Sequence, residues 1–359
     1  MPQNNENKFW ITEARLGIWS MAALAAIAIS FALSYTKAIM VPFVFSLFLY
    51  FMLLPFLRFL KNEVRLPRWL ALVITFTLVF VIVLVLTLIA VAFVRGFLDG
   101  YQDYYNRLVI ALEKGRRYLV EQGFTMAQEF DAPSYLSRLP LLNIIRNAGF
   151  GALNFISSLS LVFIFLLFLF IGTAAAETPT DSESSNVDVD DVSGNEFLME
   201  VDYKIRQYLL VKLTTSLITA IVIGTFFMFM GLDFALTFAT AVFVLNFIPT
   251  IGSIVATILP VPIALIQYDS SLMVWLIVII PGLTQFIIGS VIEPKIMGDS
   301  LKIHPVVILL SLMFWALIWG IPGAFMAVPL TAAIKIILEK IEGGHYISQL
   351  MSGDITRKK

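Results

Sequence analysis

Long stretches without any charged residue dominate the chain. Asp, Glu, Lys and Arg are absent from residues 16–36, 38–57, 69–94, 147–176, 213–232, 234–268, 270–292 and 303–334. A helix rises about 1.5 Å per residue, so about 20 apolar residues cross the roughly 30 Å hydrocarbon core of a bilayer. Each stretch reaches that length, and none shows the polar–apolar alternation of a barrel strand. Because a helix satisfies its own backbone hydrogen bonds in lipid, the pattern predicts an all-α polytopic membrane protein with about eight apolar segments.

Two of the longest stretches, both in the C-terminal half, are interrupted by proline and glycine. In 234–268 the interruption is Asn246–Ser253, and it leaves arms of about 15 residues that are too short for a full span. In 303–334 the interruption is Gly320-Ile321-Pro322-Gly323; it separates arms at 306–320 and 324–338, and Pro329 lies in the second arm. Each pattern fits either two short spans or a re-entrant helical hairpin. Paired broken segments indicate a transporter binding site, because broken helices expose backbone donors and acceptors at membrane depth.

Composition narrows the classes of function. Hydrophobic residues make up 59% of the 359 residues and charged residues only 14%, which excludes an ordinary soluble protein. The net charge of −1 gives no electrostatic reason to expect nucleic acid as a partner. The chain has no Cys and only two His, which argues against thiolate chemistry and a His-based metal site. It also lacks a Gly-x-x-x-x-Gly-Lys-Ser/Thr loop and a Gly-x-Ser-x-Gly elbow, so we expect no cofactor and no enzymatic activity.

Basic residues near the ends of the apolar stretches predict the orientation. The loop after the second stretch carries Arg58, Lys61, Arg65 and Arg68 against a single acidic residue, Glu63, and further Lys and Arg residues lie in the C-terminal tail. By the positive-inside rule, both termini are expected in the cytoplasm. The first apolar stretch is too long for a cleaved signal peptide, and we expect it to be a permanent span.

Six regions follow from these patterns. Residues 1–94 are expected to hold spans 1–3, 95–149 an extracytoplasmic and partly helical amphipathic segment, 150–171 span 4, 172–200 an acidic disordered cytoplasmic linker, 201–340 the transport region with the broken helices, and 341–359 a cytoplasmic tail. Disorder is expected in the linker because residues 177–196 are rich in Ser, Thr, Asp and Glu and cannot bury apolar surface.

The broken stretches and the polar residues beside them supply the candidate site. Ionisable groups at membrane depth are costly and therefore suggest a function, although residues 293–304 also fit an ordinary cytoplasmic turn whose lysine meets anionic headgroups. The candidate coupling or ionisable residues are Glu293, Lys295, Asp233 and His304. The candidate solute-binding residues are Asn246, Pro249, Thr250, Gly252, Ser253, Gln285, Gly320, Pro322, Gly323 and Pro329.

Four short stretches of the C-terminal half carry a resemblance to a known family. They are Asn246-Phe247-Ile248-Pro249 with Gly252, Pro294-Lys295-Ile296-Met297-Gly298, His304-Pro305-Val306-Val307, and Gly320-Ile321-Pro322-Gly323 followed by Ala327-Val328-Pro329-Leu330. In order and spacing the chain resembles the AI-2E family of bacterial permeases, also called the autoinducer-2 exporter or PerM-like family. The resemblance implies a homo-oligomeric permease whose broken-helix half moves like an elevator. Some members export the quorum-sensing signal autoinducer-2, and others are sodium/proton antiporters.

We therefore expect an inner-membrane permease that exports a small polar organic solute, with autoinducer-2 as one solute to test. Its expected partners are that solute, the lipid bilayer and further copies of the chain. One alternative is a sodium (or lithium)/proton antiporter in which Glu293 or Asp233 carries the proton. A second alternative is a membrane-assembly or regulatory protein that docks a partner on the acidic linker.

Overall fold

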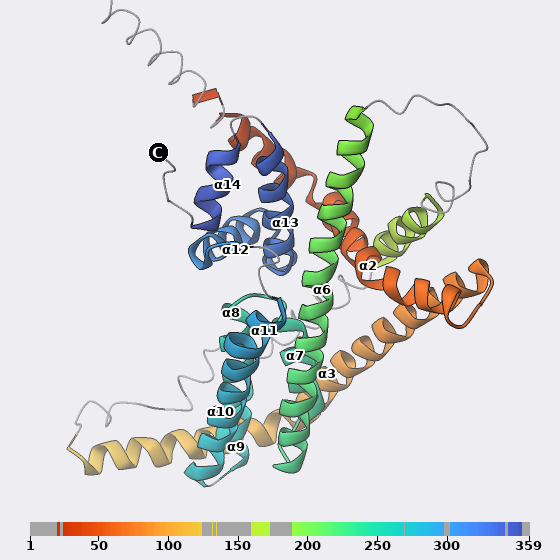
Figure 1. The fold of residues 1–359 in the computed structure, drawn as a ribbon. Coiled ribbons are helices and arrows are strands. Elements are labelled where there is room, and N and C mark those ends of the chain that lie inside the picture. Colours follow the sequence, from red (N-terminus) through yellow and green to blue (C-terminus); the bar gives the residue numbers. More distant parts are fainter. Residues whose placement is uncertain are drawn as a thin grey trace, which may run out of the picture.

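The computed structural model describes residues 20–21, 24–123, 131, 134, 159–172, 189–268, 270–297, 302–341 and 344–353. These residues form helices joined by turns and contain no strand, which confirms the all-α prediction (Figure 1). In chain order the helices are Leu24–Tyr35, α2 (Lys37–Asn62), α3 (Arg68–Glu121), Leu159–Gly172, α6 (Val189–Phe229), α7 (Ala235–Leu245), α8 (Ile251–Ile258), α9 (Val261–Gln267), α10 (Ser271–Phe286), the π-helical turn η2 (Ile287–Ile292), α11 (Glu293–Met297), α12 (Pro305–Trp319), α13 (Ile321–Lys340) and α14 (His345–Ser352).

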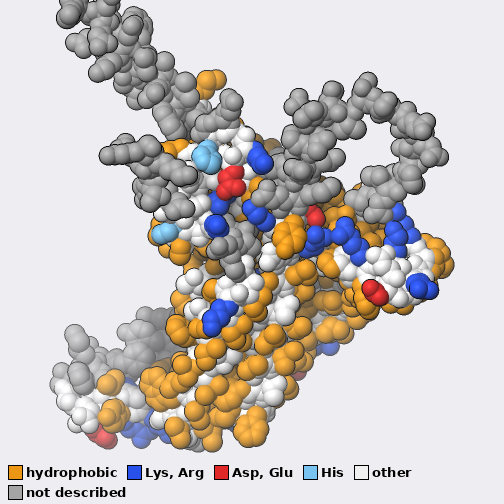
Figure 2. Space-filling model, in the orientation of Figure 1, with side chains coloured by type: hydrophobic (Ala, Val, Ile, Leu, Met, Phe, Trp, Pro, Cys, Tyr) orange, Lys and Arg blue, Asp and Glu red, His pale blue; other side chains and the backbone are white. Residues whose placement is uncertain are grey.

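Helices suited to a bilayer are spread along the described residues. Five helical segments are long and apolar enough to cross a membrane, namely Lys37–Asn62, Arg68–Gly96, Asp202–Phe229, Ser271–Met297 and Ile321–Lys340. Figure 2 shows a broad hydrophobic surface over the lower half of the molecule, with many Lys and Arg side chains gathered above it. This separation is expected when lipid surrounds the apolar helices and basic residues stay outside the hydrocarbon.

The first apolar core joins α2, α3 and the helix Leu159–Gly172. Leu166 and Phe170 are almost fully buried against α2 residues such as Leu53. From α3, the fully buried Ala71 packs into the same core. At about 1.5 Å per residue, the 54 residues of α3 extend for about 81 Å, far more than a bilayer needs. The boundary expected at residue 95 therefore falls inside one continuous helix, and the helical part of the 95–149 segment extends directly from span 3.

The acidic linker differs from the expectation at its C-terminal end. Helix α6 begins at Val189, although disorder was expected over 172–200, and the rest of that tract up to residue 188 lies mostly outside the described residues. Adding a turn to an existing helix costs much less than starting a new one, so a long helix can continue into a tract of unfavourable composition. The tail also contains helix α14, which packs on α13 through the hydrogen bond from Ser348 Oγ to Glu339 Oε1 at 3.0 Å.

Residues 234–268 fold back on themselves as a helical hairpin. Helix α7 runs back along α6, and Gly224 lies so close to Ala239 that an added Cβ would approach the alanine methyl to 2.6 Å. After the break at 246–250 the chain returns through α8 and α9, with a further bend at Pro260. Gln267, at the end of α9, accepts a hydrogen bond from the Asp233 backbone N–H at 2.8 Å, so both ends of the hairpin lie at one place.

The last apolar stretch also folds back on itself. Helices α12 and α13 pack against each other and are joined at Gly320, whose φ of 67° suits glycine. Gly323 allows this close approach, because an added Cβ would overlap the carbonyl oxygen of Trp315. The pair is attached to the N-terminal part of the chain by Trp319, whose indole Nε1 donates to the Leu33 carbonyl oxygen at 3.0 Å.

Candidate functional site

The tip of the 234–268 hairpin is shaped by its turn residues. Helix α7 ends at Leu245, and Pro249 cannot donate a backbone hydrogen bond to extend it. Thr250 adopts a positive φ of 60°, which turns the chain before α8 begins at Ile251. Gly252 is buried against the Leu245 carbonyl oxygen, where a Cβ would overlap the backbone. Figure 1 shows this tip, at the start of α8, beside the middle of α6.

Side-chain hydrogen bonds hold the tip against α6. Asn246 is 5% exposed, and its Nδ2 donates to Ser216 Oγ at 3.1 Å. The Asn246 Oδ1 accepts from Ser253 Oγ at 3.5 Å, so one amide joins both sides of the break. Ser216 lies on a polar face of α6 together with Thr215 and Thr219. The hydroxyls of these two threonines donate hydrogen bonds to backbone carbonyls of α6 itself. The break is therefore a defined polar structure within an apolar background.

Gln285 of α10 faces the tip with one polar atom unsatisfied. Its side chain is 7% exposed, and its Nε2 donates to Thr257 Oγ1 of α8 at 3.3 Å. Its Oε1 is buried and has no hydrogen-bond partner among the described residues. A buried carbonyl oxygen without a donor costs about 1–3 kcal/mol, so the position favours a bound group that can donate a hydrogen bond.

A buried ion pair lies next to this amide. Lys212 Nζ of α6 contacts Glu293 of α11 at 2.7 Å from Oε1 and 3.0 Å from Oε2. The two side chains are 7% and 13% exposed, and both lie within helical segments long enough to span a membrane. The buried phenol of Tyr208 interacts electrostatically with Glu293 from one turn earlier on α6. Pairing makes the site neutral overall, which lowers the cost of keeping charged groups in an apolar setting.

The ion pair and the side chains of Asn246, Thr257 and Gln285 line one cavity of about 520 Å³, which we call the tip cavity. Its volume falls within the range of small-molecule sites. The π-helical turn η2 contributes Gly289 and Ser290 to its wall, and such turns often occur at functional sites. Among the residues predicted from the sequence, those that line the tip cavity are Asn246, Pro249, Thr250, Ser253, Gln285 and Glu293.

The other predicted residues lie elsewhere. Gly252 is part of the tip but does not line the cavity. Lys295 is exposed on α11, and His304 is exposed at the start of α12, where its Nδ1 accepts from the Val306 backbone N–H at 3.3 Å. Asp233 is at the opposite end of the hairpin from the tip. The residues of the second break, Gly320, Pro322, Gly323 and Pro329, shape the α12–α13 pair and do not line the tip cavity.

The two broken regions nevertheless meet through aromatic side chains. Phe247 of the tip stacks on Phe325 of α13 with ring centroids 4.6 Å apart and planes 16° apart. Phe325 also stacks on Phe45 of α2 at 5.2 Å. Phe325, close to the second break, therefore packs against the tip from outside the cavity. Phe45 of the N-terminal half contacts the same phenylalanine.

The base of the hairpin is closed by a separate polar cluster. Gln267 Nε2 donates to the Gly231 carbonyl oxygen at 2.6 Å, and Tyr104 Oη of α3 donates to Asp233 Oδ2 at 3.1 Å. Burial, together with this hydrogen bond to a carboxylate, raises the pKa of Tyr104 from 10.0 to about 12. The phenol therefore stays protonated at neutral pH and continues to donate to Asp233.

Sequence reasoning missed Lys212, Ser216, Thr257 and Ser290. Lys212 is the last charge before an uncharged stretch, so it resembled a boundary residue, although it lies ten positions inside the segment Asp202–Phe229. The sequence did hold one indication of the pair. Lys212 directly precedes the uncharged stretch 213–232, and Glu293 directly follows the stretch 270–292. If these two spans run in opposite directions, both residues lie at the same side of the membrane. The described residues contain no cluster of three or more His, Asp or Glu that could hold a metal ion.

The family model and the relatives below are all described as transporters or transport proteins. The sequence model for a family described as AI-2E family transporter matches residues 18–343. The chain is 26% identical over 323 residues to the AI-2 transport protein TqsA of Escherichia coli K12, covering 89% of this chain and 90% of that protein. It is 28% identical over 334 residues to a candidate transport protein of Haemophilus influenzae, covering 89% and 92%. A candidate transport protein of Borreliella burgdorferi is 36% identical over 154 residues, which span 43% of this chain and 42% of that relative.

Proposed function

Because the chain belongs to the AI-2E family of transporters, a family of multi-pass bacterial membrane proteins, we propose that it exports a small polar organic solute across the inner membrane. The solute would bind in the tip cavity, and transport would be secondary or facilitative. Both termini would lie in the cytoplasm, and several copies of the chain would assemble together.

The unsatisfied Oε1 of buried Gln285 carries this proposal. The oxygen borders a cavity whose other polar groups are hydroxyls, amides and one neutralised ion pair. A solute with a hydroxyl group would donate to Gln285 Oε1 and remove the cost of leaving that oxygen unpaired. A solute with net charge would lack a counter-charge, since Lys212 and Glu293 already neutralise each other. The site therefore suits an uncharged, hydroxyl-bearing solute.

The packing around the cavity supports movement of the site as one body. The α6 helix, the hairpin and α10 share an apolar core that includes Phe227, Val242 and Ile277, and η2 and α11 continue directly from α10. All groups that line the tip cavity belong to these elements, so they can shift together without separating the binding groups. The internal ion pair would travel without exposing a net charge to lipid. This arrangement favours the elevator-like mechanism over a fixed channel.

Autoinducer-2 is the first solute to test, because one relative is named as its transport protein. Autoinducer-2 retained in cells would be compared between a strain without the gene, the strain with it, and the strain carrying Gln285→Leu. We expect retention to fall with the gene and to return close to the gene-free level in the variant. Gln349→Leu on α14, outside the cavity, is the matched control and should behave like the unmodified protein. Equal retention with and without the gene would exclude autoinducer-2 as the solute.

The buried Lys212–Glu293 pair favours a second candidate, a sodium/proton antiporter. A sodium ion and a proton would compete for the Glu293 carboxylate, which would couple the two ions, and Lys212 would hold that carboxylate between the two binding events. Asp233 is less suited to this role, because it is exposed and bonded to Tyr104. Sodium-driven proton flux would be measured in vesicles with Glu293→Gln and, as the comparison, Asp233→Asn. Flux that persists in Glu293→Gln would rule out this mechanism.

A further inference from the structure

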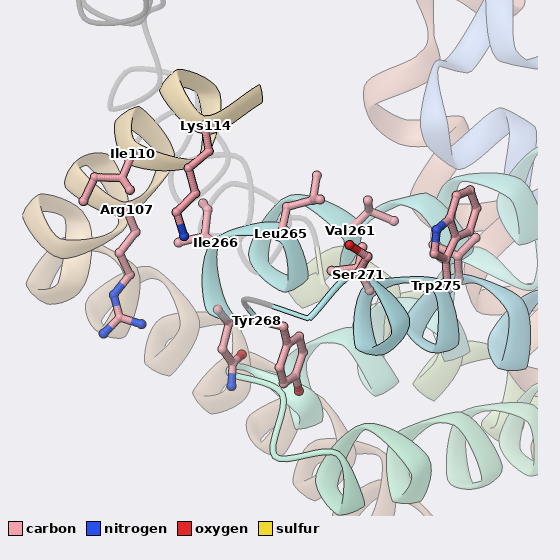
Figure 3. A pocket seen from close by; sticks show the side chains of 12 residues that line it. Arg107, Ile110, Lys114, Val261, Leu265, Ile266, Tyr268, Ser271 and Trp275 are labelled. Atoms are coloured by element: carbon pink, nitrogen blue, oxygen red, sulfur yellow. The ribbon is translucent and has the colours of Figure 1, made fainter. Parts of the chain in front are cut away.

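A second cavity lies at the base of the hairpin, between the distal part of α3 and the α9–α10 junction (Figure 3). Its volume is about 690 Å³, and none of the residues discussed for the tip cavity lines it. We call it the base cavity. It is bordered by Gln267 and Tyr268, so it adjoins the polar cluster that closes the hairpin.

The wall from α3 is cationic. Arg107, Ile110 and Lys114 line the base cavity, and their spacing of three and four residues places them on one face of the helix. None of the lining residues is Asp or Glu. Figure 3 shows the Lys114 side chain reaching from α3 toward Ile266 and Leu265 of α9. A guanidinium and an ammonium beside one cavity favour an anion, and the planar guanidinium binds phosphate oxygens in pairs.

The remaining walls are largely apolar and exposed. Ile110, Leu265 and Trp275 keep 54%, 51% and 62% of their surface accessible, although all three line the same cavity. Trp275 lies about one turn inside the segment Ser271–Met297, which is long enough to span a membrane. Tryptophan gathers at the headgroup level of a bilayer, so the base cavity is located where the membrane meets water. A free phosphate would leave this apolar surface exposed, whereas a lipid covers it with its acyl chains.

We propose that the base cavity binds an anionic phospholipid. The headgroup phosphate lies between Arg107 and Lys114, and the acyl chains lie along Leu265 and Trp275. The lipid then bridges α3 to the α9–α10 junction, beside the hydrogen bond from Tyr104 to Asp233. This binding is independent of the solute and of the transport mechanism.

The test uses the full chain in nanodiscs of phosphatidylcholine that contain a small fraction of phosphatidylglycerol with brominated acyl chains. Bromine quenches the fluorescence of nearby tryptophan side chains. The contribution of Trp275 is the difference in fluorescence between the unmodified protein and Trp275→Phe. We expect quenching by brominated phosphatidylglycerol to exceed quenching by brominated phosphatidylcholine at the same fraction. In the double variant Arg107→Gln/Lys114→Gln, the apparent affinity for brominated phosphatidylglycerol should fall about fivefold for each cation removed. This corresponds to ~1 kcal/mol for each cation.

The control Arg116→Gln/Arg117→Gln removes the same charge from the same helix outside the base cavity and should leave the affinity unchanged. The single variants Arg107→Gln and Lys114→Gln provide the same comparison if the double variant fails to fold, as judged by helicity. Equal quenching by the two lipids would overturn the proposal, as would unchanged affinity in both single variants. Displacement of the lipid by an equal concentration of inorganic phosphate would likewise identify a free anion as the occupant.

Discussion

Removing one member of the Lys212–Glu293 pair is expected to destabilise the protein far more than removing both. The ammonium nitrogen lies 2.7 Å and 3.0 Å from the two carboxylate oxygens, and the side chains are only 7% and 13% exposed. Lys212→Met leaves the carboxylate without its counter-charge, and Glu293→Met leaves the ammonium alone. The double variant leaves neither charge buried.

The magnitude follows from the geometry. At 2.7 Å and an effective dielectric constant of about 20, the attraction is about 6 kcal/mol. Much of it is offset because both charges have left water on folding. Each single variant should therefore lower the free energy of unfolding by about 3–5 kcal/mol. The double variant should stay within about 2 kcal/mol of the unmodified protein, because apolar side chains of similar volume replace a pair whose net value is small.

The assay is a double-mutant cycle on unfolding in mixed micelles, followed by helical circular dichroism. A matched control cycle uses the surface pair Arg116–Glu113, whose closest atoms are 2.9 Å apart but whose side chains are 29% and 28% exposed. Solvent screening should hold the coupling of that pair below about 1 kcal/mol. A buried pair that couples no more strongly than this control would refute the claim that Lys212 and Glu293 are desolvated together.

Three further predictions address other groups. Gln285→Leu removes a buried oxygen that lacks a donor, so we expect transport to fall while the free energy of unfolding rises by about 1 kcal/mol; a loss of both would mean that Gln285 is structural. Gly252→Ala forces a Cβ into the backbone of α7 and should cost about 2–3 kcal/mol, whereas Gly115→Ala, which meets nothing within 4 Å, should be neutral or slightly stabilising in the same unfolding assay. The pKa of Tyr104 is raised from 10.0 to about 12, so its stabilising contribution is complete below pH 10 and is lost as the pH rises toward 12. Tyr104→Phe should therefore flatten the alkaline part of a stability–pH profile, and an unchanged profile would contradict this assignment.

The sequence was sufficient for the membrane class, and it also singled out residues that line one side of the tip cavity. Asn246, Pro249 and Ser253 interrupt a long apolar stretch, and polar or helix-breaking residues in such a stretch are visible without a structure. Gln285 stood out for the same reason. These residues do line one cavity, together with Glu293.

The rest depended on packing that the sequence does not reveal. Lys212 resembled a boundary charge, because only the structure shows that α6 continues through it and that Glu293 lies within hydrogen-bond distance. Ser216 and Thr257 are common residues in membrane helices, and their contact with the tip depends on the rotation of α6 and α8. Gly320–Gly323 resembled the first break in composition, yet Gly320 supplies the turn between α12 and α13, and Gly323 allows their close approach. Local composition predicts a break, but not what the break faces.

The return of the 234–268 hairpin to its starting point also matters for how the protein is made. A segment of 35 uncharged residues is long enough for the insertion machinery to treat as a span, yet both of its ends must remain on one face of the membrane. A true crossing at this point would invert α10 and every helix that follows. The polar groups at the tip, Asn246 and Ser253, oppose such a crossing, because passing them through lipid would cost several kcal/mol. The residues that line the tip cavity in the finished protein would thus also help to set the direction of its C-terminal half during biogenesis.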